Sequence, residues 1–245
     1  MCISMRKGGK RLVPRAKASA GSIVLNIVIA VCVIAGIGLL AYPSVADWYN
    51  RSHASKATAD YVKTVDNISA QEAARMLSEA EAYNRDLFFM QDRWRPEEAD
   101  TARYESILDV TGTGIMGYVE IEKIDVKLPI YHGTSDTVLQ IAAGHMEGSS
   151  FPIDGNGVHS VISGHSALPS AKLFTDLVKM AEGDMFSVTV LDKTRWYEIV
   201  SIDTVLPEEF DGLALDPDRN LCTLMTCTPY GVNSHRLLIT GELRE

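Results

Sequence analysis

The sequence has few of the residues that hold a disulfide-rich or metal-dependent protein together. It contains four cysteines, of which only Cys222 and Cys227 lie in the part of the chain with a globular composition. An odd offset along one expected strand puts these two side chains on opposite faces, so we expect no disulfide between them. No CxxC pair and no HExxH pattern occurs, and we therefore expect neither a disulfide framework nor a catalytic metal.

The chain is also poor in positive charge over most of its length. Its net charge is −9, which argues against a nucleic acid as a partner. Lys and Arg are instead concentrated in the first 17 residues, which contain no acid. No internal repeat or low-complexity tract is present, and the 46% of hydrophobic residues is typical of a globular domain.

One long hydrophobic run follows the basic tail. The run from Ile23 to Tyr42 contains one asparagine and no charge, which is enough to cross a bilayer as a helix. The positive charges that precede it predict that the N-terminus stays in the cytoplasm. We therefore predict a cytoplasmic basic tail over residues 1–22, a transmembrane anchor over 23–43, and an extracellular remainder.

A cleaved signal peptide is the alternative interpretation of this run. Ser44-Val45-Ala46 resembles a small-x-small cleavage site, and cleavage there would release the rest of the chain. The apolar run is longer than the roughly 7–15 residues of a signal peptide, which favours retention as an anchor.

Residues 44–103 are predicted to form an extracellular helical segment followed by loops. Apolar residues at helical spacing predict helix from Ser44 to about Leu87, and Ser69-Ala-Gln-Glu72 has the pattern of a capping box. Residues 88–96 break this spacing, and residues 97–103 are so polar that we expect a loop there as well.

Residues 104–245 are predicted to form the main domain, which is mainly β. Alternating or short apolar runs bounded by Gly, Pro, Asp and Asn predict strands at 117–124, 126–131, 160–163, 185–190, 196–205, 222–226 and 236–241, with one helical patch at 170–180. Many short strands with few helices favour a closed barrel or a sandwich.

The residues around Cys227 combine a strand, a turn and a second strand. A β-rich stretch ends at Cys227, the segment Thr228-Pro-Tyr-Gly231 forces a turn, and the chain resumes at His235-Arg236. If the second strand returns antiparallel, Arg236 lies beside Cys227, where a guanidinium can bind an oxyanion. A buried core cysteine and a surface arginine are the alternatives, but neither explains the turn between them.

The same stretch resembles a known family. Thr223–Gly231, followed by Asn233 and His235-Arg236-Leu-Leu238, resembles the signature of sortases, in particular the pilin-polymerising class C. Further matching stretches are Gly117–Lys123, Leu128–Gly133, Gly144–Gly148, Ser163–Pro169 and Leu173–Leu177. The resemblance covers about Tyr104 to Glu242. It implies a sortase-type eight-stranded β-barrel with short helices, here preceded by a helical segment and a transmembrane helix.

The resemblance also implies a membrane-anchored cysteine transpeptidase. Cys227 would be the nucleophile, His165 the acid/base partner and Arg236 the oxyanion stabiliser. The substrate would be a Leu-Pro-x-Thr-Gly-like (LPxTG) sorting signal on a pilin or surface protein, cut between Thr and Gly through a thioacyl intermediate. The acceptor would be a pilin lysine amine, and no cofactor is needed. The other histidines show no metal-ligand spacing: His53, His132, His145, His159 and His235.

A lid before the barrel is a further expectation from class C. Lids of that class carry Asp-Pro-aromatic, with the Asp facing the catalytic Arg and the ring covering the Cys. This sequence has Asp92-Arg93-Trp94, in which the spacing fits but Arg replaces Pro. The resemblance therefore implies that Asp92 faces Arg236 and that Trp94 covers Cys227. An ordinary polar loop anchored by one tryptophan is the alternative.

Three other functions remain as alternatives at this point. A sortase could attach surface proteins to peptidoglycan through a cell-wall amine, and a thiol hydrolase would resolve the thioester with water. A membrane-tethered binding module could use the same barrel without catalysis, although binding needs no thiol. The sequence does not separate an amine from water as the second substrate.

Overall fold

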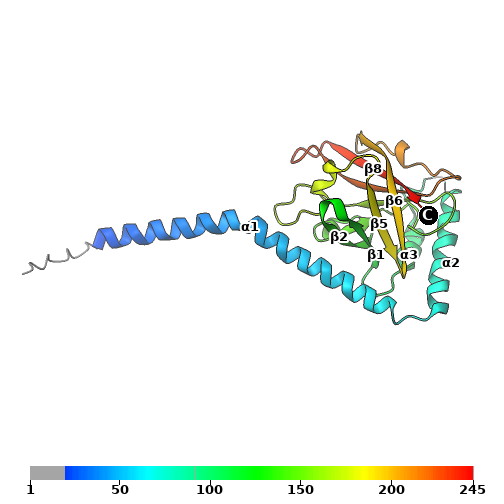
Figure 1. The fold of residues 1–245 in the computed structure, drawn as a ribbon, viewed down its shortest axis with the longest axis horizontal. Helices are drawn as coiled ribbons and strands as arrows, with labels where there is room; N and C mark the ends of the chain where they lie inside the picture. Colours follow the sequence, from blue (N-terminus) through cyan, green and yellow to red (C-terminus); the bar gives the residue numbers. More distant parts are fainter. Residues whose placement is uncertain (1–19, 91, 245) are drawn as a thin grey trace, which may run out of the picture. The chain divides into compact units, whose positions relative to one another are not determined.

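The computed structural model describes residues 20–90 and 92–244 (Figure 1). The chain divides into two compact units, with the boundary between Tyr42 and Pro43. The basic tail predicted over residues 1–22 lies almost entirely outside the described residues. The expected helices and strands all fall within the described ranges.

Helix α1 (Ala20–Val65) contains the candidate membrane span. The helix is long enough and apolar enough to cross a bilayer. Apolar side chains in this part are exposed, such as Leu39 at 77% and Leu40 at 84%. Exposure of so many apolar groups is unfavourable in water and suits a lipid environment.

The second part of α1 belongs to the larger unit and packs one face against it. Ala54, Thr58 and Tyr61 recur at intervals of three to four residues and are all buried. The Tyr61 hydroxyl donates a 2.9 Å hydrogen bond to the carbonyl of Met116 and accepts one of 2.8 Å from the amide of Leu191. The helix is therefore fixed to the barrel at the start of one strand and just after the end of another.

Helix α2 (Ala70–Leu87) begins where the capping box predicts. The Ser69 hydroxyl accepts a 3.1 Å hydrogen bond from the amide of Glu72, which satisfies one of the free amides at the helix start. The Ser69 cap and the helical segment are confirmed, whereas the Glu72 carboxylate accepts from Arg75; the chain leaves the helix after Val65 and re-enters it at Ala70. The buried face of α2 carries Ala80, Tyr83, Asn84 and Leu87.

Helix α3 (Glu98–Ser106) corrects the expectation of a loop at residues 97–103. Acidic Glu98 and Asp100 occupy its first turn and basic Arg103 its last turn, an arrangement that complements the helix dipole. Tyr104, 1% exposed, anchors the helix in the core. The segment has too few apolar residues for helical periodicity to reveal it, and one buried aromatic holds it in place.

The strands close into a barrel in the order β1-β2-β3-β4-β7-β8-β6-β5. Figure 1 shows β5, β6 and β8 side by side. The eight-stranded fold predicted from the sequence is confirmed. The strands are β1 (Ile115–Ile121), β2 (Val126–His132), β3 (Ala143–His145), β4 (His159–Ser163), β5 (Met185–Val190), β6 (Lys193–Val205), β7 (Leu221–Thr228) and β8 (His235–Arg244).

Two details differ from the sequence-based prediction. Strand β3 was not expected, because three residues including a glycine carry no alternating pattern. The helical patch at residues 170–180 is only a short 3₁₀ turn, η2 (Thr175–Lys179). The remaining short turns are η1 (Glu122–Ile124), α4 (Asp136–Leu139) and η3 (Asp211–Leu213).

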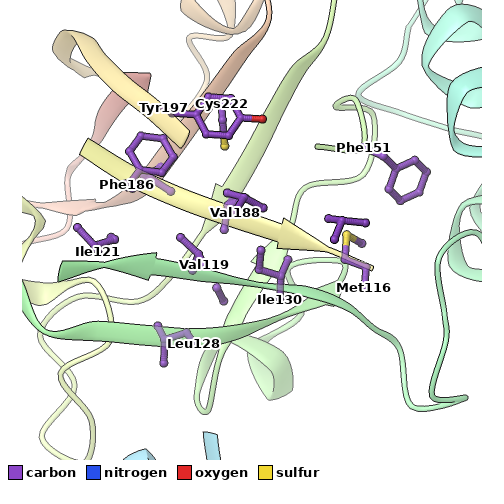
Figure 2. Close-up of a cluster of buried hydrophobic side chains, with 14 of the residues drawn as sticks. Met116, Val119, Ile121, Leu128, Ile130, Phe151, Phe186, Val188, Tyr197 and Cys222 are labelled. Carbon is purple, nitrogen blue, oxygen red and sulfur yellow. The ribbon is translucent and has the colours of Figure 1, made fainter. Parts of the chain in front are cut away.

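The core fills the inside of the barrel (Figure 2). Alternate residues of β1 and β5 point inward, including Val119, Ile121, Phe186 and Val188, all fully buried. At the bulge in β1, a Cβ added to Gly117 would stand 2.3 Å from the carbonyl oxygen of Thr189. Glycine at this position therefore permits β1 and β5 to approach closely enough to close the barrel.

Candidate active site

Cys227 and Arg236 lie opposite each other on neighbouring strands. Strands β7 and β8 pair antiparallel, and the register places Cys227 against Arg236. Side chains of directly opposed residues share one face of the sheet and lie about 4.5–5.5 Å apart at Cβ. The hairpin predicted from the sequence is confirmed, and both side chains are half-buried rather than enclosed in the core.

The other cysteine of the barrel occupies a different environment. Cys222 is fully buried among the core residues (Figure 2), and burial raises the pKa of its thiol. The odd offset along β7 thus separates the two thiols as predicted, with Cys222 inside the barrel and Cys227 on the other face. Of these two thiols, only Cys227 is accessible to a substrate.

The turn between β7 and β8 is built by the residues that the sequence suggested. The amides of Val232 and Asn233 both donate to the carbonyl oxygen of Pro229, each at 3.0 Å. Gly231 and Asn233 have φ angles of 73° and 60°, in the left-handed region that glycine and asparagine tolerate best. This tight return is what brings β8 back alongside Cys227.

His165 follows directly after a strand that runs parallel to β7. Strand β4 pairs with β7 so that Ser163 lies beside Met225. The amide of Gly164 donates to the carbonyl of Met225 at 3.0 Å, and the Thr226 hydroxyl donates to the carbonyl of Gly164 at 2.7 Å. His165 therefore leaves β4 next to the end of β7 that carries Cys227.

The residue after His165 is also attached to β7. The Ser166 hydroxyl donates a 2.7 Å hydrogen bond to the carbonyl oxygen of Cys227. His165 is thus held between two residues that both contact β7, and its own side chain is half-buried. The loop after β4 and the strands β7 and β8 therefore place the backbones of the three predicted catalytic residues at the same end of β7.

A buried ring requires glycine immediately before His165. A Cβ added to Gly164 would lie 2.6 Å from the ring of Phe174, which is fully buried. The amide of Phe174 donates to the carbonyl of His165 at 3.0 Å. Phe174 and Thr226 are therefore structural supports of the site that sequence reasoning did not identify, because neither carries a reactive group.

Arg236 has hydrogen-bonding capacity left for a ligand. Its guanidinium donates to the carbonyl oxygens of His235 at 3.1 Å and Asn233 at 3.3 Å. Within the described ranges, no carboxylate lies within ion-pair distance of Arg236. A guanidinium has five N–H donors, so several remain to bind a developing negative charge.

The predicted pairing of Asp92 with Arg236 is not present. Asp92 is exposed and lies 4.0 Å from the guanidinium of Arg95 instead. The three-residue spacing on a turn places Arg95 near Asp92, whereas Arg236 is held by the β7–β8 turn. This part of the lid expectation is wrong for the structure described.

Trp94 does lie against the face that carries Cys227 and Arg236. It packs on an apolar group that we term the outer cluster: Val161, Leu213 and Leu238, with Met146, Val205, Phe210 and Met225 around them. Met225 is two residues before Cys227 and Leu238 two residues after Arg236, so all four side chains project from one face. Trp94 also stacks on Phe210, with 5.1 Å between ring centroids.

Arg93 holds the same segment in place. Its guanidinium donates to the carbonyl of Gly148 at 3.0 Å and to the carbonyl of Leu213, and lies 4.2 Å from the centre of the Trp94 ring. Arg93, which stands where the expected motif has proline, therefore links residues 92–94 to the loop between β3 and β4 and to the loop between β6 and β7.

The remaining barrel histidines have structural contacts. His145 is fully buried, with one ring nitrogen 3.0 Å from the Tyr104 hydroxyl and the other 2.8 Å from the carbonyl of Ser150. Burial lowers the pKa of His145 to about 3. His159 contacts the carbonyl of Ala214 and the Thr223 hydroxyl, each at 2.8 Å, and burial lowers its pKa as well. Both rings stay neutral inside the fold.

A family model described as the sortase domain matches residues 119–244. The chain belongs to the sortase family. The matched region contains β4, β7 and β8, and with them His165, Cys227 and Arg236. Sortases as a family are cysteine transpeptidases. Membership of this family gives a chemical reason for the accessible thiol of Cys227, which a role in core packing does not.

Solved structures place this sortase near class C. It is similar to sortase C1 from Streptococcus agalactiae, with 41% identity, a TM-score of 0.74, and 78% of this chain and 98% of that chain covered. Clostridium perfringens sortase C, solved with a C-terminal cell wall sorting motif, shows 36% identity, a TM-score of 0.67 and coverage of 78% and 100%. Streptococcus pneumoniae sortase C, described in terms of pilin substrate specificity, shows 37% identity and a TM-score of 0.69, with 78% of this chain and 97% of that chain covered.

The curated relatives give a shorter match. Three sortases align at 25–31% identity, and the chain spans 53–62% of the length of each of them. The solved class C structures, in contrast, match over nearly their whole length.

Proposed function

We propose that this sortase cleaves an LPxTG-like sorting signal between Thr and Gly and transfers the cleaved protein to a lysine amine of a pilin. The observation that carries the proposal is the pairing of Cys227 with Arg236 across β7 and β8, with both neighbours of His165 hydrogen-bonded to the same end of β7. A nucleophile, a donor for an oxyanion and an acid/base group are the parts that acyl transfer requires.

The first half of the reaction forms a thioester. His165 takes the proton of the Cys227 thiol, the thiolate sulfur attacks the Thr carbonyl carbon, and the S–C bond forms as the carbonyl oxygen takes up negative charge. Arg236 donates hydrogen bonds to this oxyanion. The oxyanion then collapses, the Thr–Gly C–N bond breaks, and His165 gives a proton to the leaving Gly amine. A thioacyl-enzyme and a free amine remain.

The second half resolves the thioester. A lysine amine attacks the thioacyl carbon after His165 removes a proton from it, and Arg236 again binds the oxyanion. Collapse of this intermediate breaks the S–C bond and leaves the isopeptide bond, and His165 passes its proton to the Cys227 sulfur to restore the thiol. Bonds and protons balance with no cofactor.

The choice of a pilin lysine rests on the class C relatives. Pilin substrate specificity is stated for the Streptococcus pneumoniae protein, to which this chain is 37% identical. A peptidoglycan amine as acceptor, which would attach surface proteins to the cell wall, is the second candidate. Water as acceptor would make the protein a thiol hydrolase, and nothing in the site favours it over an amine.

We also propose that α1 anchors the protein with its N-terminus in the cytoplasm. The basic residues before the apolar run carry this orientation. The catalytic domain would then face the cell exterior, where sorting signals of secreted pilins and surface proteins arrive.

We further propose that residues 92–94 form a lid in which Trp94 and Arg93 carry the closure. Trp94 fills the outer cluster beside Cys227 and Arg236, and Arg93 fastens the segment to the carbonyls of Gly148 and Leu213. Asp92 would belong to the lid only by position, since its ion pair is with Arg95.

The test uses the full chain in detergent micelles. The protein is incubated with a fluorescent peptide containing Leu-Pro-x-Thr-Gly, with and without a lysine-bearing peptide taken from a pilin. We expect a Cys227-linked thioacyl species by mass spectrometry and an isopeptide product when the amine is present. Cleavage that yields only the free acid at saturating amine would contradict transpeptidation and support the hydrolase.

A further inference from the structure

The loop that follows His165 is held in an unusual backbone conformation. Ala167 and Leu173 have φ angles of 62° and 40°, in a region that residues with a Cβ rarely adopt. Such conformations persist only where the surrounding structure fixes them, and they cluster at functional sites. The two residues bracket an arc, residues 168–172, whose ends meet in a bridge between Leu168 and Ala171.

The inner end of this loop is fixed by contacts already described. Gly164 and Ser166 are bonded to β7, and the Phe174 amide donates to the His165 carbonyl at 3.0 Å. The Ala167 amide donates to the Thr175 hydroxyl at 3.1 Å. These bonds close the base of the loop but do not reach its outer arc.

The outer arc is fixed by α1. The Asn50 side-chain amide donates a 2.8 Å hydrogen bond to the carbonyl of Ser170, and the backbone amide of Lys172 donates one of 2.8 Å to a carboxylate oxygen of Asp47. Asp47 and Asn50 lie three residues apart, so they share a helix face. That face continues to Ala54 and to Tyr61, whose hydroxyl fixes the helix to the barrel.

Packing supports the arc on one side only, where Ala171 and Leu173 are buried against the core. A cavity of about 230 Å³ lies at this place, lined by Asp47, Asn50, Lys172 and Leu173 together with residues of β2. An open space gives the arc no van der Waals contacts on that side. Without the two bonds, the arc therefore has room to relax away from its unusual conformation.

We infer that Asp47 and Asn50 are positioning residues for His165. They hold the arc, the arc fixes Phe174, and the amide of Phe174 holds the carbonyl of His165. The inference rests on the proposed function, in which His165 moves protons at the thioester. The helix that leaves the membrane span is thus part of the support of the active site.

A matched pair of isosteric variants tests this. Asn50→Asp removes the side-chain donor to the Ser170 carbonyl and places an acceptor against that carbonyl. Asp47→Asn keeps an oxygen that can accept from the Lys172 amide, whereas Asp47→Ala does not. Arg51→Ala is the control, because Arg51 forms its ion pair with Asp125 and makes no bond to the loop.

We expect a selective effect on turnover of the full chain in micelles. Displacement of a reacting group by about 1 Å can cost about 100-fold in rate. Asn50→Asp and Asp47→Ala should each lower kcat for the sorting peptide by about 10-fold to 100-fold, on that scale. KM should stay within twofold and so should the kcat of Arg51→Ala. Asp47→Asn should recover most of the kcat that Asp47→Ala loses.

A second measurement does not depend on peptide cleavage. The chain has six histidines, so the His165 ring signal can be assigned in a ¹H–¹³C spectrum by comparison with His165→Asn. Asn50→Asp should shift or broaden that signal, and Arg51→Ala should not.

The outcomes separate the two proposals. A wild-type chain that cleaves no sorting peptide, but whose His165 signal responds to Asn50→Asp, would overturn the function and leave the positioning role supported. Unchanged kcat and an unchanged His165 signal in Asn50→Asp and Asp47→Ala would overturn the positioning role. So would a kcat loss matched by an equal loss of folded protein, or no recovery in Asp47→Asn.

Discussion

The Ser166 hydroxyl and the carbonyl oxygen of Cys227 are joined by a 2.7 Å hydrogen bond. Ser166 follows the proposed acid/base residue, and Cys227 is the proposed nucleophile. The bond therefore ties the residue that follows His165 to the backbone of Cys227 through the Ser166 side chain. The distance between a nucleophile and its proton partner controls the rate of covalent catalysis.

Ser166→Ala should weaken that link without removing a reacting group. The half-buried carbonyl of Cys227 loses its side-chain partner, which typically costs about 1 kcal/mol or somewhat more in the free energy of unfolding. We expect kcat to fall by about 10-fold through misplacement of His165. Steady-state kinetics and urea denaturation of the full chain check both values. Ser234→Ala is the control, because that exposed hydroxyl lies within hydrogen-bond distance of the His235 ring.

Cys227→Ala should abolish both thioacyl formation and cleavage. Loss of the nucleophile removes the covalent route, while the half-buried position tolerates a small side chain. Cys222→Ala should retain most activity, because Cys222 lies inside the barrel with its thiol pKa raised by burial. Residual turnover of purified Cys227→Ala with a wild-type circular dichroism spectrum would contradict the assignment of the nucleophile.

Arg236→Lys should lower kcat strongly, although the substitution keeps the positive charge. A planar guanidinium can hold the backbone carbonyls of the turn and still donate to an oxyanion, which a single ammonium cannot do. Loss of one oxyanion donor typically costs about 10²–10³ in kcat. Arg244→Lys on the same strand is the matched control, because Arg244 forms an exposed ion pair with Glu198. A loss below about 10-fold in Arg236→Lys would assign Arg236 another role.

Much of the barrel could be predicted from the sequence, for a physical reason. Along a strand with one buried face, successive side chains alternate between the buried and the exposed face. Cys222 and Cys227 are an odd number of residues apart, which alone predicts that they lie on opposite faces. The turn residues Pro229 and Gly231 predicted the hairpin, and the hairpin places Cys227 opposite Arg236.

Other features depended on contacts between distant parts of the chain. Helix α3 has almost no periodicity and is held by the burial of Tyr104. The predicted pairing of Asp92 with Arg236 was wrong because a local turn places Arg95 three residues from Asp92, whereas Arg236 is distant in the sequence. The hydrogen bond from Asn50 to the carbonyl of Ser170 joins residues that are 120 positions apart and involves a backbone carbonyl, which no sequence pattern encodes.

Trp94→Ala should open the face beside Cys227. The substitution removes the stack on Phe210 and the contacts with the outer cluster, and an aromatic pair is worth about 0.5–1.5 kcal/mol beyond its burial. A lid held closed by this free energy exposes Cys227 only in the fraction of molecules that are open. Trp94→Ala raises that fraction, so a small thiol reagent should label Cys227 about 2-fold to 10-fold faster.

Three variants locate the closure within the segment. Arg93→Ala should also speed labelling, because it frees the carbonyls of Gly148 and Leu213. Asp92→Ala should not, since Asp92 pairs with exposed Arg95. Trp196→Ala removes another partly exposed tryptophan, on β6, as a control. Equal labelling rates in wild type, Trp94→Ala and Arg93→Ala would show that residues 92–94 do not control access.

The buried histidines predict how stability depends on pH. Burial lowers the pKa of His145 to about 3, whereas a histidine in an unfolded chain titrates near pH 6.5. As the pH falls from 7 to 5, the unfolded chain therefore binds a proton that the folded chain does not. The free energy of unfolding should then decrease, by up to about 1.4 kcal/mol per pH unit for one such group. His159, whose pKa is also lowered, acts in the same direction.

This window isolates the histidines from the carboxylates. Glu242, whose pKa is lowered by Arg219, loses its stabilising effect only below about pH 5, because a free Glu titrates near 4.3. Urea denaturation of the full chain in micelles at pH 7, 6 and 5 measures the slope. His145→Gln keeps an amide for hydrogen bonding but cannot bind a proton, so it should be less stable at pH 7 and show a shallower slope. A wild-type free energy that does not change between pH 7 and 5 would mean that His145 is reached by water and protonated within the folded barrel.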